Sequence, residues 1–283
     1  MASFTNFATL SYNGGTTNSN TVTGEILEAL TAVKTAVSAN YSAGGRVTYA
    51  LSLVNTGTTA ITGYTVTDDL GGYTVGANTV YPLAYNAGTV RYYINGVLQA
   101  SPTVTAGPPL TVTGLTVPAG GSAVLIYETT ATNVAPLATG GSITNTAAIT
   151  GGGLINPITA QATVETENSA DLTISKALSP TTVTENGQIT YTFVISNTGN
   201  TEAAATDNVV VTDTFDPVLR NITVTYNGTA WTEGTNYTYN ATTGVFTTQA
   251  GQITVPAASF SQNADGTFAV TPGTATLVIT GTV

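Results

Sequence analysis

Apolar and polar residues alternate in short segments along most of the chain. The segments RVTYALSLVN at 46–55, GYTVTDD at 63–69 and ITYTFVISN at 189–197 are rich in valine, threonine, isoleucine and tyrosine. Turn sequences such as NTG, NGG and PAG separate segments of this kind. Because successive side chains of a strand point to opposite faces of a sheet, a period of two predicts strands with one buried face. The pattern therefore predicts an all-β chain.

The two halves of the chain contain an internal repeat. LTAVKTAVSANYSAGGRVTYALSLVNTG at 30–57 aligns without a gap with LTISKALSPTTVTENGQITYTFVISNTG at 172–199. Short strands repeated in this way predict two tandem immunoglobulin-like β-sandwiches, at 27–168 and 169–283. A length of 283 residues with 42% apolar content can supply a core for each.

One part of the repeat also has helix-forming residues. GEILEALTAVKTAV at 24–37 combines alanine, leucine and glutamate, which favour helices. Its counterpart, DLTISKAL at 171–178, has the pattern of a strand. We therefore expect a strand in both halves.

The N-terminus resembles the end of a sandwich. SFTNFATLSYNGG at 3–15 is similar to SITNTAAITGGG at 142–153, and a threonine-rich segment follows each of them. The first sandwich is expected to close with its own strand at 142–150. The second stops at TATLVITGTV, 274–283, the counterpart of AVLIYETTA at 123–131, and has no closing strand after it. Residues 1–26 are therefore predicted to be a detached donor strand segment.

A sandwich without its last strand leaves backbone and core groups unpaired, at a cost of about 1 to 3 kcal/mol for each buried group. The N-terminal strand of another copy can fill the gap, and such a head-to-tail contact propagates into a filament. The sequence therefore predicts a structural subunit whose partner is itself. Strand alternation gives the donor residues that enter the neighbour: Phe4, Asn6, Ala8, Leu10 and Tyr12.

Composition excludes several other functions. The chain has 5 basic and 15 acidic residues, which disfavours nucleic acid or an anionic membrane as a partner. It has no cysteine and no histidine, which excludes disulfides, thiolate or imidazole metal sites and Ser-His-Asp triads. We therefore expect no enzyme activity, no cofactor and no metal. The N-terminus shows no conventional export signal and no segment has the length of a membrane span.

The lysines are the most informative polar residues. The chain has only Lys34 and Lys176, and they occupy the same position of the repeat. Alternation points both toward a core, together with one aspartate and one asparagine for each sandwich. The two predicted sets are Lys34, Asp68 and Asn145 in the first sandwich, and Lys176, Asp213 and the donor strand's Asn6 in the second.

Four segments, DLTISK, ITYTFVISNTGN, VVVTDTF and ITNTAAIT, resemble the bacterial surface repeat family called domain of unknown function 11. The resemblance covers nearly all of both halves. Within that family the two-repeat chain is similar to the main subunit of clostridial spore appendages. The resemblance implies an extracellular location on a spore or cell surface, with assembly in the mother cell followed by lysis in place of an export signal.

The buried polar set resembles the self-forming isopeptide sites of Gram-positive pilin and adhesin domains. That resemblance implies a bond from Lys34 to Asn145 with Asp68 as the acid, and one from Lys176 to Asn6 of the next subunit with Asp213 as the acid. Burial favours the neutral amine that attacks the amide and the protonated carboxyl that polarises it. The alternative is a buried ion pair capped by an asparagine, without a bond. Glu128 is a rival acid in the first half only.

Other interpretations stay open at this point. The chain is also consistent with an adhesin or ligand-binding module cut from a longer repeat array. Fourteen tyrosines can serve as a stacking platform for sugars, although strands more often use them in cores and cross-strand pairs. Adjacent aspartates such as Asp68 and Asp69 suggest calcium, but turn or register roles fit them better.

Overall fold

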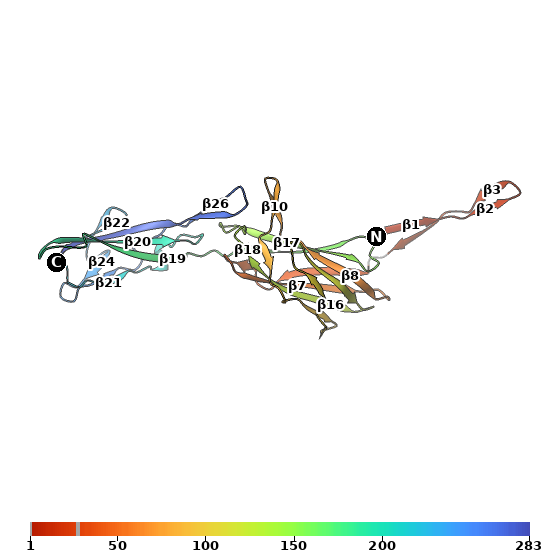
Figure 1. Cartoon of the computed structure of the whole chain (residues 1–283), viewed down its shortest axis with the longest axis horizontal. Helices are drawn as coiled ribbons and strands as arrows, with labels where there is room; N and C mark the ends of the chain where they lie inside the picture. Colours follow the sequence, from red (N-terminus) through yellow and green to blue (C-terminus); the bar gives the residue numbers. More distant parts are fainter. Residues whose placement is uncertain (1, 27–28) are drawn as a thin grey trace.

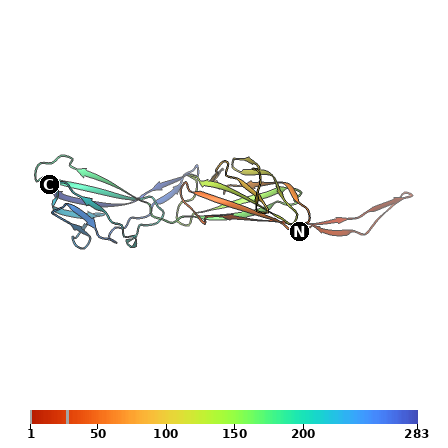
Figure 2. The same ribbon diagram turned by 90° about the horizontal axis from the view of Figure 1, so that it is seen from below.

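The structure is a computed structural model that describes residues 2–26 and 29–283. It is all-β, as predicted, and contains two tandem β-sandwiches with an N-terminal hairpin (Figure 1). The hairpin projects from one end and the second sandwich lies at the other, and a perpendicular view shows the same elongated arrangement (Figure 2). No helix in the described part of the chain is long and apolar enough to cross a membrane.

The first sandwich, called sandwich 1, has two sheets of six strands each. One sheet contains, in spatial order, β13 (Val97–Leu98), β12 (Arg91–Ile94), β16 (Ser122–Ala131), β7 (Arg46–Asn55) and β5 (Leu30–Ala36), with β11 (Leu83–Tyr85) also on β16. The other contains β14 (Thr103–Thr105), β15 (Leu110–Val117), β8 (Ile61–Asp68), β17 (Ser142–Gly151), β18 (Ile158–Thr166) and β6 (Asn40–Tyr41). A small hairpin joins β9 (Tyr73–Val75) and β10 (Asn78–Val80).

The second sandwich, called sandwich 2, has fewer strands in its second sheet. Its larger sheet contains β19 (Leu172–Ser179), β20 (Gln188–Asn197), β28 (Gly273–Thr282), β22 (Arg220–Tyr226) and β23 (Thr229–Trp231). The facing sheet contains only β21 (Thr212–Thr214), β25 (Val245–Thr248) and β24 (Tyr237–Tyr239) among the described residues. A 3-10 helix at Ala205–Asp207 precedes β21.

Strand alternation builds each core. In β16 every second residue from Ala123 to Ala131 is buried, and the central strand β7 alternates in the same way. The inward residues of the two sheets form one apolar cluster in sandwich 1 and a second, separate cluster in sandwich 2. The segment 30–36 is a strand, as its repeat partner indicated, while Leu27 and Glu28 lie outside the described residues.

The N-terminal segment differs from the predicted single strand. Strand β1 (Ala2–Asn6) pairs with β4 (Val22–Ile26), and β2 (Thr9–Tyr12) pairs with β3 (Gly15–Asn18). Asn13 and Gly14 turn the chain with φ of 41° and 80°, the left-handed geometry that two-residue hairpins require. The donor segment is therefore a two-stranded hairpin of residues 2–26, because its threonine-rich second half returns beside the first.

A second hairpin braces the two sandwiches against each other. Strands β26 (Ser259–Gln262) and β27 (Phe268–Thr271) extend from sandwich 2 to sandwich 1 (Figure 1). Gln262 Nε2 donates a hydrogen bond to the hydroxyl of Tyr73 at 2.8 Å, and the Phe268 N–H donates to the Asn133 carbonyl at 3.0 Å. Asn200 also donates to the Leu137 carbonyl at 3.0 Å. These contacts fix the sandwiches end to end.

Candidate cross-linking and assembly site

The predicted polar set of sandwich 1 meets in the core. Lys34 comes from β5, Asp68 from the end of β8 and Asn145 from β17, and each is almost fully buried. The pairing of Ala147 with Asp68 brings β17 beside β8 and places Asn145 next to the carboxylate's strand end. Alternation therefore gave the correct inward direction for all three side chains in this sandwich.

Lysine and aspartate form a direct contact there. Lys34 Nζ lies 2.6 Å from Asp68 Oδ2, and the Tyr127 hydroxyl donates a hydrogen bond to the same oxygen. The other carboxylate oxygen accepts the N–H of Leu70 at 3.1 Å. The ammonium also lies 4.8 Å from the ring centroid of Tyr49. These contacts hold the aspartate in place, with its Oδ2 directed at the amine.

Asn145 has an unusual environment. Its Oδ1 and Nδ2 are buried, and neither makes a hydrogen bond of good geometry among the described residues, although the Tyr49 and Tyr127 hydroxyls lie near enough to interact with the amide. An unpaired buried polar group costs about 1 to 3 kcal/mol, so a side chain with both atoms unpaired requires an explanation. A reactive amide placed beside an amine is one explanation, because its carbonyl carbon and leaving nitrogen must stay accessible to the attacking group.

Burial changes the protonation of this cluster. It lowers the pKa of Lys34 below the usual lysine value, although Asp68 and Asp69 oppose the shift. Burial raises the pKa of the Tyr127 and Tyr49 hydroxyls, and the Asp68 charge acts in the same direction. Both hydroxyls therefore stay protonated, although only that of Tyr127 donates a hydrogen bond, while the amine is easier to deprotonate than a lysine in water.

The tyrosines were missed in the sequence analysis. Tyr127 and Tyr49 are direct cross-strand partners in β16 and β7, and their rings stack at 5.8 Å. The alternation in AVLIYETTA places Tyr127 inward with Leu125, so the sequence did contain the signal. Glu128 points the other way and pairs with Arg46 at the surface, at 3.3 Å, and so does not take part in the buried cluster.

The set in sandwich 2 differs in burial. Lys176 Nζ lies 2.5 Å from Asp213 Oδ2, and the amine sits 4.5 Å from the Tyr191 ring centroid. The lysine side chain is 40% exposed, however, compared with 0% for Lys34. Asn6 is also exposed, at the far end of the molecule in the N-terminal hairpin. In the single chain this set is not buried, because no described strand covers β19; its burial with a neighbour's donor strand in place stays a prediction.

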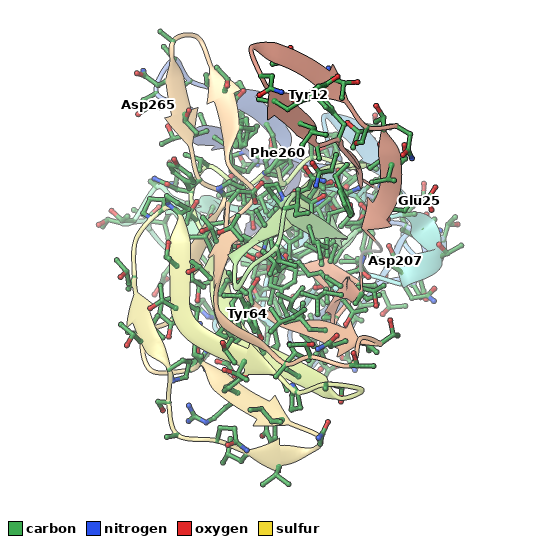
Figure 3. The ribbon with its side chains drawn as sticks, turned by 90° about the vertical axis from the view of Figure 1, so that its right-hand side faces the viewer. Tyr12, Glu25, Tyr64, Asp207, Phe260 and Asp265 are labelled. Carbon is green, nitrogen blue, oxygen red and sulfur yellow. The ribbon has the colours of Figure 1, made fainter. Side chains whose placement is uncertain are left out.

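The donor residues are exposed as well. Figure 3 shows Tyr12 and Glu25 on the outside of the hairpin. Phe4, Leu10 and Tyr12 are 53%, 62% and 62% exposed, and Asn6 and Ala8 are exposed too. Phe7, which the alternation assigned to the outward face, is 55% exposed. Three large apolar side chains on one face of an isolated hairpin indicate a surface that another element covers.

The other polar candidates have local roles. Asp69 Oδ1 accepts the N–H groups of Gly71 and Thr146, at 2.8 and 2.9 Å, which fixes β17 against the turn after β8. No group of three or more acidic residues that could hold a metal ion occurs among the described residues. Most tyrosines in sandwich 1 belong to its core or pack against it.

Comparisons with known proteins add little beyond the fold. No family model and no curated protein sequence matches the chain. Among solved structures, the major pilin subunit of Bacillus cereus is 13% identical, with a TM-score of 0.37 over 96% of this chain and 73% of that one. A 35 kDa C-terminal fragment of a major pilin of Streptococcus agalactiae has 13% identity and a TM-score of 0.37, over 87% of this chain and 86% of the fragment.

A glycoside hydrolase of Clostridium perfringens also superimposes, with a TM-score of 0.30 over 50% of this chain and 28% of that one. Its identity is 11%. Similarities this distant carry no argument about the function of this chain, which is inferred below from its own geometry.

The bond predicted from Lys34 to Asn145 should depend on pH through the lowered pKa of Lys34. The attacking amine must be neutral, and the groups facing it are Asp68, Asp69, Tyr49 and Tyr127. Refolded protein is expected to lose one ammonia faster as pH rises, and to reach its maximal rate below the pH at which a free lysine deprotonates. Intact-mass spectrometry after refolding at a series of pH values measures this rate. A rate independent of pH would contradict the amine mechanism.

Proposed function

We propose that the chain is the subunit of an extracellular filament, in which the N-terminal strand of one copy completes sandwich 2 of the next. The observation that carries the proposal is the difference between the two sandwiches. In sandwich 1 the single strand β17 pairs with β8, whereas among the described residues β21, the counterpart of β8, pairs with β25 alone, so the N-terminal strand of another copy can take the place of β17. The sheet of sandwich 2 thus ends in an open edge beside Asp213.

The donor sequence fits that edge in a defined register. In sandwich 1 Ala147 lies opposite Asp68, and Ile149 lies opposite Val66. Aligning SFTNFATL with SITNTAAI, and VVVTD with YTVTD, places Ala8 opposite Asp213 and Leu10 opposite Val211. Asn6 then enters the core of sandwich 2, as Asn145 enters the core of sandwich 1.

This arrangement supports head-to-tail polymerisation. The hairpin and the open edge lie at opposite ends of the molecule (Figures 1 and 2). A donor at one end and an acceptor at the other cannot close on themselves in one chain, and copies therefore add in series. Each contact also buries the apolar face of the N-terminal segment, and this burial supplies the main favourable free energy of adding a subunit.

A covalent bond can then form at each contact. The Lys176 amine attacks the amide carbon of the next subunit's Asn6, the Nζ–Cγ bond forms and the Cγ–Nδ2 bond breaks. Asp213 takes a proton from the amine and passes it to the departing nitrogen, which leaves as ammonia. The same chemistry joins Lys34 to Asn145 within sandwich 1, with Asp68 as the acid.

The proposal includes the family and the location. The resemblance of DLTISK, VVVTDTF and ITNTAAIT to the domain of unknown function 11 repeats supports a surface protein, and the spore appendage subunit is the narrower form of it. The absence of histidine and cysteine from the sequence supports a structural role rather than an enzymatic one. Electron microscopy of purified protein tests the function: we expect filaments, and persistent monomers would overturn it.

Substitutions at the contact test the covalent bond. The wild-type chain should give a ladder of bands that resists boiling in detergent, and Lys176→Ala or Asn6→Ala should abolish it. Lys176→Arg is the matched control, because it keeps the charge beside Asp213 without a nucleophilic amine. It should keep the filaments and lose the ladder. If wild-type filaments dissolve to monomer on boiling in detergent, the covalent bond is ruled out and only the strand exchange remains proposed.

A further inference from the structure

Two strands, β17 and β18, complete sandwich 1, and β18 covers a different neighbour from β17. Strand β17 completes the sheet beside β8, while β18 follows it and packs beside β5, the strand that carries Lys34. Strand β18 also pairs in parallel with β6, through Glu165 with Asn40 and Thr166 with Tyr41. The burial of Lys34 therefore depends on β18 as well as on β17.

Sandwich 2 lacks both strands. Its β19 corresponds to β5, yet Ile174 is 55% exposed and Leu178 is 38% exposed, and Lys176 between them is exposed too. In β5 the residues at the repeat positions of Lys176 and Leu172 are buried. A single donor strand beside β21 would leave the face of β19 open, because in sandwich 1 that face is covered by β18 and not by β17.

The base of the N-terminal hairpin, β1 with β4, has the register of the closing hairpin, whereas β2 with β3 is shifted by one residue. Ser3 pairs with Glu25, as Ser142 pairs with Glu165. Asn6 pairs with Val22, as Asn145 pairs with Ala162. Directly opposite residues of an antiparallel pair share one face, so Val22 and Gly24 of β4 face the same way as Asn6 and Phe4 of β1. The chain thus carries a second copy of the element that sandwich 2 lacks.

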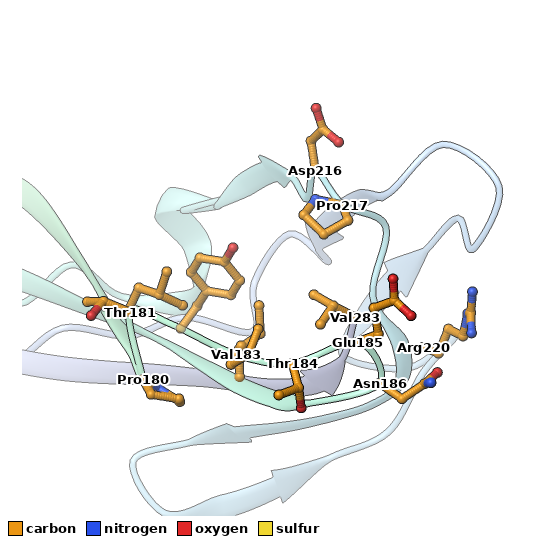
Figure 4. A pocket seen from close by; sticks show the side chains of 13 residues that line it. Pro180, Thr181, Val183, Thr184, Glu185, Asn186, Asp216, Pro217, Arg220 and Val283 are labelled. Atoms are coloured by element: carbon orange, nitrogen blue, oxygen red, sulfur yellow. The ribbon is translucent and has the colours of Figure 1, made fainter.

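One pocket of sandwich 2 lies at the position that corresponds to Ile143 of sandwich 1. A cavity of about 550 Å³ opens between Leu178, Val183, Tyr191 and Pro217 at the end of the sandwich (Figure 4). Its wall also includes Asp216, the counterpart of Gly71. In sandwich 1 the side chain of Ile143 lies so close to Gly71 that an added Cβ would come within 2.6 Å of it.

Phe4 occupies the position of Ile143 in the donor. Its ring covers Gly24, where an added Cβ would overlap it, and the corresponding pair in sandwich 1 is Ile143 with the buried Val164. A larger residue on β1 is thus matched by a smaller one on β4. The Phe4 ring lies over Gly24, so β1 and β4 present one joint face at this position.

We propose that the whole N-terminal hairpin is the donor: residues 8–12 pair with residues 209–213 at the β21 edge of the next copy, β1 continues past that edge, β4 covers β19, and the Phe4 ring enters the cavity beside Pro217. The inference rests on the proposed filament function and specifies its contact. It places Glu25 beside Thr182 in a parallel pair, as Glu165 lies beside Asn40 in sandwich 1.

The role of β4 in the contact can be tested by substitutions on its two faces. Val22→Asp places a charge on the inward face of β4, and Thr23→Asp places the same charge on the outward face. Both positions are exposed in the single chain, so neither variant disturbs the monomer. Val22→Asp is expected to reduce filament yield at least tenfold by sedimentation, and Thr23→Asp to leave it unchanged. Equal, wild-type yields for both variants would overturn the inference.

A cross-link gives an independent readout, since the chain has no cysteine of its own. The double variant Glu25→Cys, Thr182→Cys should form an intersubunit disulfide on oxidation, seen by mass spectrometry as a reducible peptide pair joining positions 25 and 182. Filaments without this pair, alongside loss of filaments on hairpin deletion, would sink the two-stranded donor and keep the proposed function. A wild-type chain that forms no filaments would overturn both.

Discussion

Deletion of residues 1–26 should abolish filament formation completely. The deletion removes every donor residue and leaves sandwich 1 intact, because β17 and β18 come from its own chain. Sandwich 2 keeps its open edge at β21 and its uncovered β19, and it has no strand to accept. Electron microscopy and light scattering should show monomers or disordered aggregates in place of ordered filaments.

A synthetic peptide of residues 2–26 provides the matched control for this deletion. Added to the truncated protein, it should occupy the open sandwich and raise the melting temperature of sandwich 2, because a ligand that binds only the folded state stabilises it. The same peptide added to the full chain should shorten the filaments by capping acceptor ends. Ordered filaments from the truncated protein would contradict the donor role of the hairpin.

The variant Asn145→Ala distinguishes the two interpretations of the buried cluster, because they predict changes of opposite sign in the stability of sandwich 1. If Lys34 is bonded to Asn145, the substitution removes a cross-link across a long loop and should lower the stability of sandwich 1 by about 4 kcal/mol. That loss corresponds to a fall in melting temperature of roughly 10 °C. Differential scanning calorimetry measures it, and the variant should also retain the ammonia that wild type loses.

The ion-pair reading predicts the opposite result. Without a bond, Asn145 carries two buried atoms that lack partners, so alanine would relieve a cost of about 1 to 3 kcal/mol for each group. The variant would then be as stable as wild type or more stable. Thr144→Ala, on the outward face of the same strand, controls for any general effect of substitution in β17.

The sequence was sufficient for the all-β fold and for part of the site. Alternation in RVTYALSLVN and the repeated opening strand led to two sandwiches, and parity placed Lys34, Asp68 and Asn145 in one core. These predictions succeed because the period of a strand fixes which face each side chain takes. Tyr127 followed the same rule and was overlooked because a tyrosine in a strand is common.

The second half of the N-terminal segment was not predictable from alternation. GTTNSNTVTGEI is polar and rich in threonine, and it contains too few apolar residues to show a strand pattern. Its pairing with β1 and β2 depends on the turn at Asn13 and Gly14 and on backbone hydrogen bonds between partners such as Ser3 and Glu25. The exposure of Lys176 was not predictable for a similar reason. Strand alternation gives the direction of a side chain, but not whether another strand of the same chain covers it.

The direction of the hairpin has a mechanical consequence. Its strands run along the long axis of the molecule (Figure 1), and the β26–β27 brace holds the two sandwiches on that axis. A pull on a filament built from the proposed contact would load the hairpin in shear, so that its backbone hydrogen bonds to the next copy would have to break together rather than one after another. With the bond from Lys176 to Asn6 in place, the force would pass from backbone to backbone without any non-covalent step.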